Sequence, residues 1–223
     1  MKKTAFVRAA LVAALVTASA SIASAAPAYS WNLSRAMMSN FGTNPHNGGG
    51  PWSAMYDAVG STLNPANFQM MPTLASNWMG QPQDAWTFPT SHSLSVSVPT
   101  GPLPMGSNPV VAKGMPMLHP GPGKSSVVRW KSPLNGSVHV LARISDANAG
   151  CGNGIAWTIL RDSMSVAAGT LPDGHNGTVV HLQVPVTAFT ATHPGTSIYF
   201  VVSPNGNDHQ CDSTILDVLI AGQ

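Results

Sequence analysis

Polar and apolar side chains alternate along most of the chain beyond residue 90, with the period of two that is typical of β-strands. Leu94, Val96 and Val98 alternate with serines, and the apolar residues from Val138 to Ile144 share one face in the same way. The predicted strands are 94–98, 125–131, 138–144, 155–159, 178–186, 198–202 and 215–220. Seven strands separated by Gly, Pro or Asn predict an all-β fold, an antiparallel β-sandwich or jelly roll.

The stretch 118–144 carries this signature best. A Gly- and Pro-rich turn leads into the apolar strand 125–131, and Asn135-Gly136 predicts a tight turn into the next strand. Residues 26–90 are harder to assign, although they hold four of the six Trp. We expect an irregular, Trp-rich, loop-rich segment there, with one short helix over 52–59 after Pro51, and the main strands over 91–223.

The first 25 residues have the three parts of a secretory signal peptide. Basic residues precede an apolar run over 9–20, and Ala23-Ser24-Ala25 is a small-residue cleavage site. The apolar run is too short for a membrane-spanning helix, and no second long run follows it. We therefore predict that residues 26–223 form a single exported domain without a membrane span, either periplasmic or secreted.

Charge and composition exclude several classes of protein. Without the three basic residues of the leader, seven Lys and Arg face eight Asp, a net charge of −1 with neutral His. A chain this close to neutrality lacks the basic surface that nucleic acids or an anionic membrane require. It also contains no Glu, which excludes zinc proteases of the H-E-x-x-H type and EF-hands. The eight His show no metal-ligand spacing, and we expect the eleven Met to fill the core.

Two cysteines in an exported chain predict one disulfide, Cys151–Cys211, between two turn-rich loops. These loops also carry oxygen ligands of the kind that calcium prefers. The candidate ligands are Asp146, Asn148, Asp208 and Asp212. The alternative is that these side chains only satisfy the backbone of their turns. No cofactor is predicted beyond this structural calcium.

Exposed aromatic rings flanked by amides and carboxylates suit sugar binding by a β-sandwich. The two candidate sets are Trp52, Tyr56, Asn44 and His46, and then Trp78 and Trp86. Gly48-Gly49-Gly50 is expected to keep the first set out of a strand. The alternative is that these Trp residues fill the core, because Trp is mostly buried on average.

Three segments together resemble a known kind of protein. They are Asn44–Ser53 with its N-P and P-W-S motifs, Leu118–Gly136 with L-H-P-G and V-V-R-W, and Ile198–Thr214 with I-Y-F-V-V and C-D-S-T. The combination resembles a secreted bacterial β-sandwich module of exported surface proteins, including those with PEP-CTERM sorting tails, and resembles carbohydrate-binding jelly rolls. The chain departs from the sorted members because it shows no C-terminal anchor. The resemblance implies a fold rather than an activity.

We expect a non-catalytic exported protein that binds glycan or another surface polymer through loop aromatics. One alternative is a structural matrix protein without a small ligand, and a second is a secreted hydrolase. The chain has no G-x-S-x-G motif and no Cys left over as a nucleophile, so no catalytic residue is predicted. A hydrolase would need an Asp pair or a dispersed triad.

Overall fold

A computed structural model of the chain describes residues 29–40, 50–60, 63–88, 91–105, 110–206 and 208–222. The predicted signal peptide and two candidate ligand-binding residues, Asn44 and His46, lie outside these ranges. The statements below concern the described residues.

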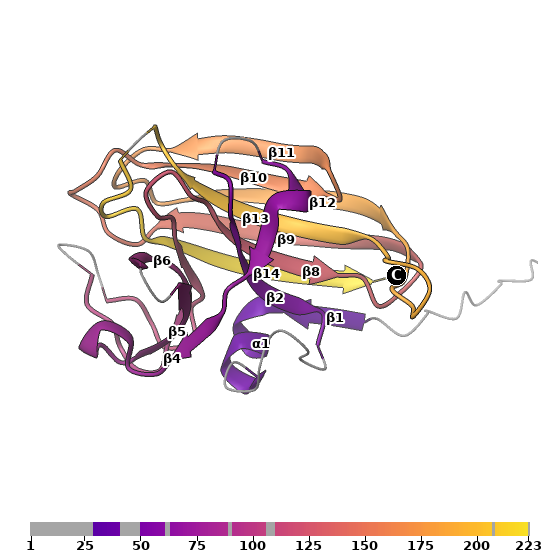
Figure 1. Cartoon of the computed structure of the whole chain (residues 1–223), viewed down its shortest axis with the longest axis horizontal. Coiled ribbons are helices and arrows are strands. Elements are labelled where there is room, and N and C mark those ends of the chain that lie inside the picture. The colour runs from indigo at the N-terminus through magenta and orange to yellow at the C-terminus, as the bar shows by residue number, and fades with distance from the viewer. Residues whose placement is uncertain are drawn as a thin grey trace, which may run out of the picture.

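Two antiparallel sheets pack face to face, as the alternating pattern predicted, and their long strands form the body of the molecule (Figure 1). The strands of sheet A are β1 (Tyr29–Asn32), β4 (Thr73–Ala75), β5 (Gln83–Phe88), β6 (Ser91–Pro99), β7 (Met117–His119), β9 (Gly136–Asp146), β12 (Thr178–Val186) and β14 (Thr214–Gly222). Those of sheet B are β2 (Trp52–Asp57), β3 (Phe68–Met70), β8 (Ser126–Lys131), β10 (Ile155–Arg161), β11 (Met164–Leu171) and β13 (Ser197–Pro204). The all-β sandwich is therefore confirmed, with an N-terminal segment of short elements and loops.

The strands follow one another in space in an order quite different from their order in the chain. Sheet A runs β12-β9-β14-β7-β6-β5-β4, with β1 also paired to β14, and sheet B runs β11-β10-β13-β8-β2-β3. The N-terminal segment contributes β2 and β3 to sheet B and β1, β4 and β5 to sheet A. It therefore completes both layers of the sandwich.

Asn135-Gly136 joins two strands that do not pair with each other. β8 lies in sheet B and β9 in sheet A, so the chain crosses between the layers here. Gly136 opens β9 at a φ of +129°, a conformation that residues with a Cβ rarely adopt. Asn135 Oδ1 accepts a hydrogen bond from the backbone N–H of Ala188 at 2.8 Å. The expected tight turn is thus a connection between sheets.

The prediction of a short helix over residues 52–59, after Pro51, is wrong. Residues 52–57 are strand β2, in which Trp52 lies opposite Trp130 and Tyr56 opposite Ser126 of β8. A six-residue segment of mixed periodicity takes its structure from the strand that pairs with it, which its own sequence does not reveal. The expectation that the glycines before Trp52 would keep it out of a strand fails for the same reason.

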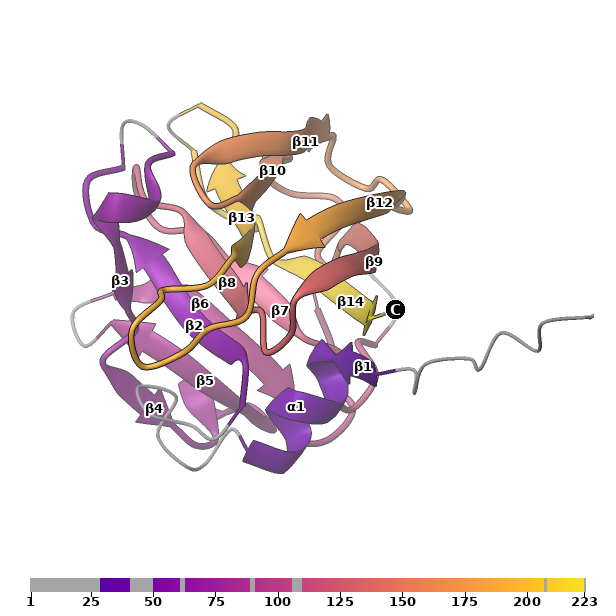
Figure 2. The same ribbon diagram turned by 90° about the vertical axis from the view of Figure 1, so that its right-hand side faces the viewer.

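The α-helix of the described chain is α1 (Leu33–Asn40), which lies beside β1 at one end of the sandwich (Figure 2). Asn32 caps it, because its Oδ1 accepts a hydrogen bond from the backbone N–H of Arg35 at 2.8 Å. Leu33 and Met37 lie one turn apart and are both buried in the core. α1 therefore closes this end of the sandwich with its apolar face.

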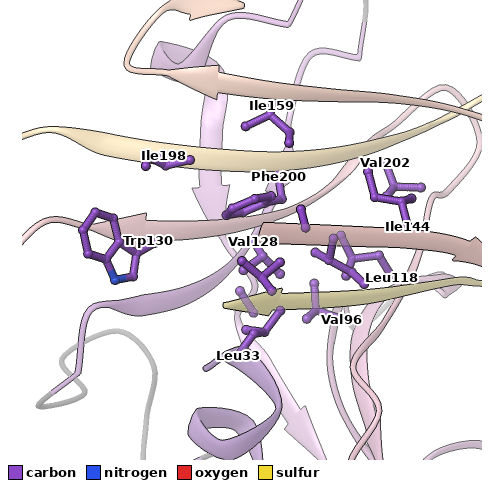
Figure 3. Packing of buried hydrophobic residues seen from close by; sticks show 14 of the residues in the cluster. Leu33, Val96, Leu118, Val128, Trp130, Ile144, Ile159, Ile198, Phe200 and Val202 are labelled. Carbon is purple, nitrogen blue, oxygen red and sulfur yellow. The ribbon is translucent and has the colours of Figure 1, made fainter. Parts of the chain in front are cut away.

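The core lies between the sheets and takes side chains from both (Figure 3). Its members include Val96, Leu118 and Ile144 of sheet A, Val128, Trp130, Ile159, Ile198, Phe200 and Val202 of sheet B, and Leu33 of α1. Trp130 is completely buried. Two short 3-10 turns, η1 (Pro65–Asn67) and η2 (Trp78–Gly80), lie in the N-terminal segment.

Candidate ligand-binding site

The face of sheet A that points away from the core is polar along β5 and β6. Leu94, Val96 and Val98 point into the core, so Ser95 and Ser97 point the opposite way. Gln83 on β5 shares this outward face, since Asp84 lies opposite Val98 and the residues of a strand alternate. All three polar residues are buried nonetheless, Ser95 to 1%, Ser97 to 2% and Gln83 to 5% exposure. Something other than the core must therefore cover them.

The cover is the segment between β6 and β7. Leu103 and Val111 exchange backbone hydrogen bonds of 3.0 and 2.8 Å, which folds this segment back on itself. Both side chains pack with Met117 and Ala147 in a small apolar cluster on the outer face of sheet A. A polar strand face is thereby enclosed without entering the main core.

The cover leaves a groove of about 620 Å³ between itself and the turn η2. We call it the Trp78 groove, and its defining residues are Trp78, Gln83, Ser95, Ser97, His119 and Asn148. Apolar side chains of Met79, Met105 and Pro122 line it beside these polar ones. No Lys, Arg or Asp lies among the described residues of its lining, so the groove is uncharged apart from His119.

Turn η2 holds Trp78 half-buried in the lining of this groove. The residues on either side of it, Asn77 and Met79, have φ values of 50° and 57°, in the left-handed region. That conformation is uncommon for residues other than glycine, and strained backbone of this kind clusters at ligand-binding sites. Backbone hydrogen bonds from Gly80 N–H to Asn77 O at 2.9 Å and from Gln81 N–H to Trp78 O at 3.1 Å fix the turn.

Two amide oxygens of the groove are buried without a hydrogen-bond partner among the described residues. They are Gln83 Oε1 and Asn148 Oδ1. A buried acceptor left unsatisfied costs about 1 to 3 kcal/mol, so native proteins keep few of them. A hydroxyl donor brought to either oxygen would remove that cost, and this requires the amide group to turn toward the groove, because neither oxygen is exposed to solvent.

His119 is the ionisable member of the groove. Burial lowers the pKa of its imidazole, and the charge of nearby His209 lowers it further, while hydrogen bonds to the backbone of Pro120 and Ser93 raise it. Its Nδ1 lies 2.7 Å from Pro120 O, and its ring centroid lies 6.4 Å from that of His209. The balance keeps His119 neutral at pH 7, so the groove carries no net charge there.

A second cavity, of about 270 Å³, lies between α1 and the end of the sandwich. We call it the α1 pocket, and its defining residues are Trp31, Arg35, Met37, Trp52 and Trp86. Trp31 and Trp52 are half-buried, whereas Met37 and Trp86 are almost fully buried. Its walls are mainly apolar, unlike the floor of the Trp78 groove.

The structure does not assemble the predicted aromatic sets as the sequence suggested. Trp52 lines the α1 pocket, but Tyr56 is only 7% exposed, and its hydroxyl donates a hydrogen bond to Gln69 Oε1 at 2.9 Å. Trp78 and Trp86 lie on opposite faces of sheet A, because Trp86 points into the core and Trp78 lines the outer groove. The second set is therefore divided between the two cavities. Trp78 lines the Trp78 groove, and Trp86 lines the α1 pocket together with Trp52 of the first set.

The polar floor of the Trp78 groove was missed from the sequence. Serines that alternate with apolar residues, as Ser95 and Ser97 do, normally face water. The covering segment is rich in Pro and Gly and has no periodicity, so nothing local shows that it folds over this face. The clue in the sequence was β6, where Ser93, Ser95 and Ser97 alternate with Leu94, Val96 and Val98.

The predicted disulfide Cys151–Cys211 is confirmed, with a Cα–Cα distance of 5.7 Å. It joins two loops that are also tied by side-chain amides. Asn153 Nδ2 donates to Asn205 O at 2.6 Å, and Asn205 Nδ2 donates to Asn153 O at 3.0 Å. The bridge thus brings together the loops that carry the predicted calcium ligands.

Two of the four predicted ligands satisfy the backbone of their turns. Asp146 accepts backbone hydrogen bonds from Asn148 at 2.8 Å and from Gly174 at 2.7 Å, and Asp208 accepts one from Gln210 at 3.0 Å. The described residues contain no group of three His, Cys, Asp or Glu arranged to hold a metal ion. Calcium at this end of the fold stays a prediction.

Asp212 differs from these neighbours. Its side chain is 3% exposed, and its Oδ2 has no hydrogen-bond partner in the described chain. Burial raises the pKa of its carboxyl to about 7, and the charges of Asp208, Asp146 and Asp173 contribute to the rise. The cavity beside it measures about 10 Å³, which is room for about one water molecule or ion and not for a substrate. A raised carboxyl pKa here therefore does not indicate catalysis.

No known family model matches this chain, and no curated protein does. Among solved structures it is similar to CBM51 from Clostridium perfringens GH95 in complex with methyl-galactose, at 11% identity and a TM-score of 0.38, over 76% of this chain and all of that one. It is also similar to a family 35 carbohydrate-binding module from an environmental isolate, at 15% identity and a TM-score of 0.30, over 44% of this chain and 66% of that one. A cyclase from Fischerella sp. TAU is similar as well, at 11% identity and a TM-score of 0.37, over 77% of this chain and 84% of that one.

These neighbours include carbohydrate-binding modules and an enzyme, and their similarity is too low to assign an activity to this chain. None of the helices in the described part of the chain is long and apolar enough to cross a membrane.

Proposed function

We propose that this protein is a glycan-binding β-sandwich module and that the sugar occupies the Trp78 groove. The observation that carries the proposal is the buried Gln83 Oε1, an acceptor without a partner among the described residues, in a groove lined by an indole. Sugar hydroxyls supply the missing donor, and the apolar face of a pyranose ring packs against an aromatic ring. The proposal therefore accounts for both features with one ligand.

The size and polarity of the groove support a sugar rather than an apolar molecule. Its volume of about 620 Å³ lies within the range of roughly 300 to 1,000 Å³ that is common for small-molecule sites. Gln83, Ser95 and Ser97 line it with one amide and two hydroxyl groups on neighbouring strands. Groups of this kind both donate and accept hydrogen bonds, as the hydroxyls of a sugar also do.

The ligand that fits this groove is a neutral glycan. A uronic acid, sialic acid or sulfated sugar would bury a negative charge beside a neutral His119 with no Lys or Arg in the described lining. Burying an unpaired charge is expensive, whereas burying a hydrogen-bonded hydroxyl is not. The disulfide agrees with an oxidising, exported setting, where such polymers are found.

The proposal is tested by affinity electrophoresis in gels that contain neutral or anionic polysaccharides. We expect retardation in at least one neutral gel and none in pectate or alginate. Trp78→Ala should abolish the retardation, whereas Phe189→Ala should keep it, because Phe189 is exposed on a loop outside the groove. Migration unchanged in every neutral gel would instead favour a structural protein without a small ligand.

A further inference from the structure

We propose that the α1 pocket is a second binding site, which takes a flat aromatic molecule of about two fused rings carrying one anionic group. The site is separate from the Trp78 groove, because the α1 pocket opens into the space between the sheets and the groove lies on the outer face of sheet A. The inference does not depend on whether the groove binds glycan.

The volume of the α1 pocket sets the size of the ligand. A cavity of about 150 Å³ lined by apolar side chains binds benzene. The α1 pocket measures about 270 Å³, which leaves room for a second fused ring. It also reaches the surface, since the exposed residues Ser39 and Gly50 belong to its lining.

The walls select an aromatic ligand. Indoles of Trp31, Trp52 and Trp86 line the pocket from three different strands. Two of them are braced by further rings, since the Trp31 centroid lies 5.2 Å from that of Trp130, and the Trp52 centroid lies 6.3 Å from that of Phe200. Rings fixed in this way offer faces and edges to an aromatic guest at no further cost in side-chain entropy.

The charges around the pocket select an anion. Arg35 of α1 belongs to the lining and is exposed, and no ion pair joins its guanidinium to another described residue. No acidic side chain lies in the described lining. A carboxylate or sulfonate next to Arg35 would therefore find a cation without having to displace another anion.

The polar atoms near Arg35 place this anionic end at the mouth of the pocket. Ser39 and Arg35 both lie on the exposed side of α1, whereas Leu33 and Met37 point to the core. An aromatic body would thus enter between the indoles while its charged group stays close to water. This orientation avoids the cost of burying the charge.

The test titrates the full chain with 2-naphthoate, neutral 2-naphthamide and decanoate, followed by tryptophan fluorescence and calorimetry. We expect 2-naphthoate to bind and to change the emission, with an affinity about tenfold above that of the amide and above that of decanoate. Arg35→Gln should remove the preference for the acid over the amide while both still bind. Arg143→Gln, a change on β9 outside the pocket lining, should leave the preference intact.

Filling the pocket gives an independent check. Ala36→Phe on α1 and Ala54→Leu on β2 each place added atoms into the cavity, because both residues line it. We expect each folded variant to lose 2-naphthoate binding, and two positions keep the test usable if one variant unfolds. Absence of binding by the wild-type chain, binding that survives in a folded filled variant, or a preference for decanoate would each overturn the proposal. Trp78→Ala should not alter this binding.

Discussion

The buried carboxyl of Asp212 makes the stability of the fold depend on pH. Its pKa is raised to about 7 in the folded protein, against an ordinary value of 3.8. Between these two values the folded chain binds a proton that the unfolded chain has released. Stability from this group is therefore complete at low pH and is lost as the pH rises through about 7.

The size of the effect follows from the shift. Each pKa unit corresponds to about 1.4 kcal/mol, so three units correspond to about 4 kcal/mol. Asp173 and Asp208 are exposed, and salt screens their charges. Only about two of these units lie above pH 5, so we expect a loss of about 1 to 3 kcal/mol in the free energy of unfolding between pH 5 and pH 8.

Urea unfolding at the two pH values measures this loss directly. Asp212→Asn removes the ionisable group and should flatten the pH dependence. Asp217→Asn on β14 is the matched control and should leave the dependence as it is in the wild type, because Asp217 does not line the cavity beside Asp212. Equal stability of the wild type at pH 5 and pH 8, or an equal loss in Asp212→Asn, would refute the reasoning.

The same unfolding experiment tests the predicted calcium. An ion beside Asp212 would neutralise the carboxyl charges of Asp146 and Asp173, which line the same cavity. Excess calcium should then restore stability at pH 8, where the carboxylates are ionised, and should do so less at pH 5. Identical unfolding curves with calcium and with a chelator would contradict the calcium prediction.

Further predictions concern the loops and turns. Replacing both Cys151 and Cys211 by Ser should lower the free energy of unfolding by about 4 kcal/mol in the chain-entropy model, because the bridge spans 60 residues; denaturant unfolding with no change in midpoint would contradict this. Gly154→Ala should destabilise far more than Gly80→Ala. Both glycines have positive φ, but a Cβ at Gly154 would lie 2.1 Å from Leu171 O, whereas one at Gly80 meets nothing within 4 Å. Thermal melting compares the two variants, and equal losses would show that the contact does not matter.

The fold could be predicted well from the sequence where strands were long and alternating. β9 and β12 show the clear period of two, since each has one face on the core and one in solvent. β2 could not be predicted, because its residues are buried on both faces and lack a period. Its neighbours β3 and β8 pair with it from segments that are distant in the chain or irregular.

The structure places Trp52 and Trp78, two of the predicted ligand-binding residues, in the linings of two cavities, and ligand binding by either stays a prediction. Tyr56 on β2 and Trp86 on β5 both point into the core. The register of β2 with β8 and of β5 with β6 sets these orientations, and the sequence does not reveal that register. The disulfide needed only the cysteine count and the exported setting. The serine floor depended on a covering loop, and such a contact leaves no local pattern.

The proposed function depends on a hydrogen bond that a sugar hydroxyl donates to Gln83 Oε1 in the Trp78 groove. Calorimetric titration of Gln83→Leu with the best neutral oligosaccharide, alongside thermal melting of the free protein, tests it most directly. Removing a buried acceptor without a partner should leave the free protein at least as stable as the wild type. Sugar affinity should fall tenfold or more, because a hydrogen bond to the ligand is lost. Unchanged affinity in a stable variant would contradict the account.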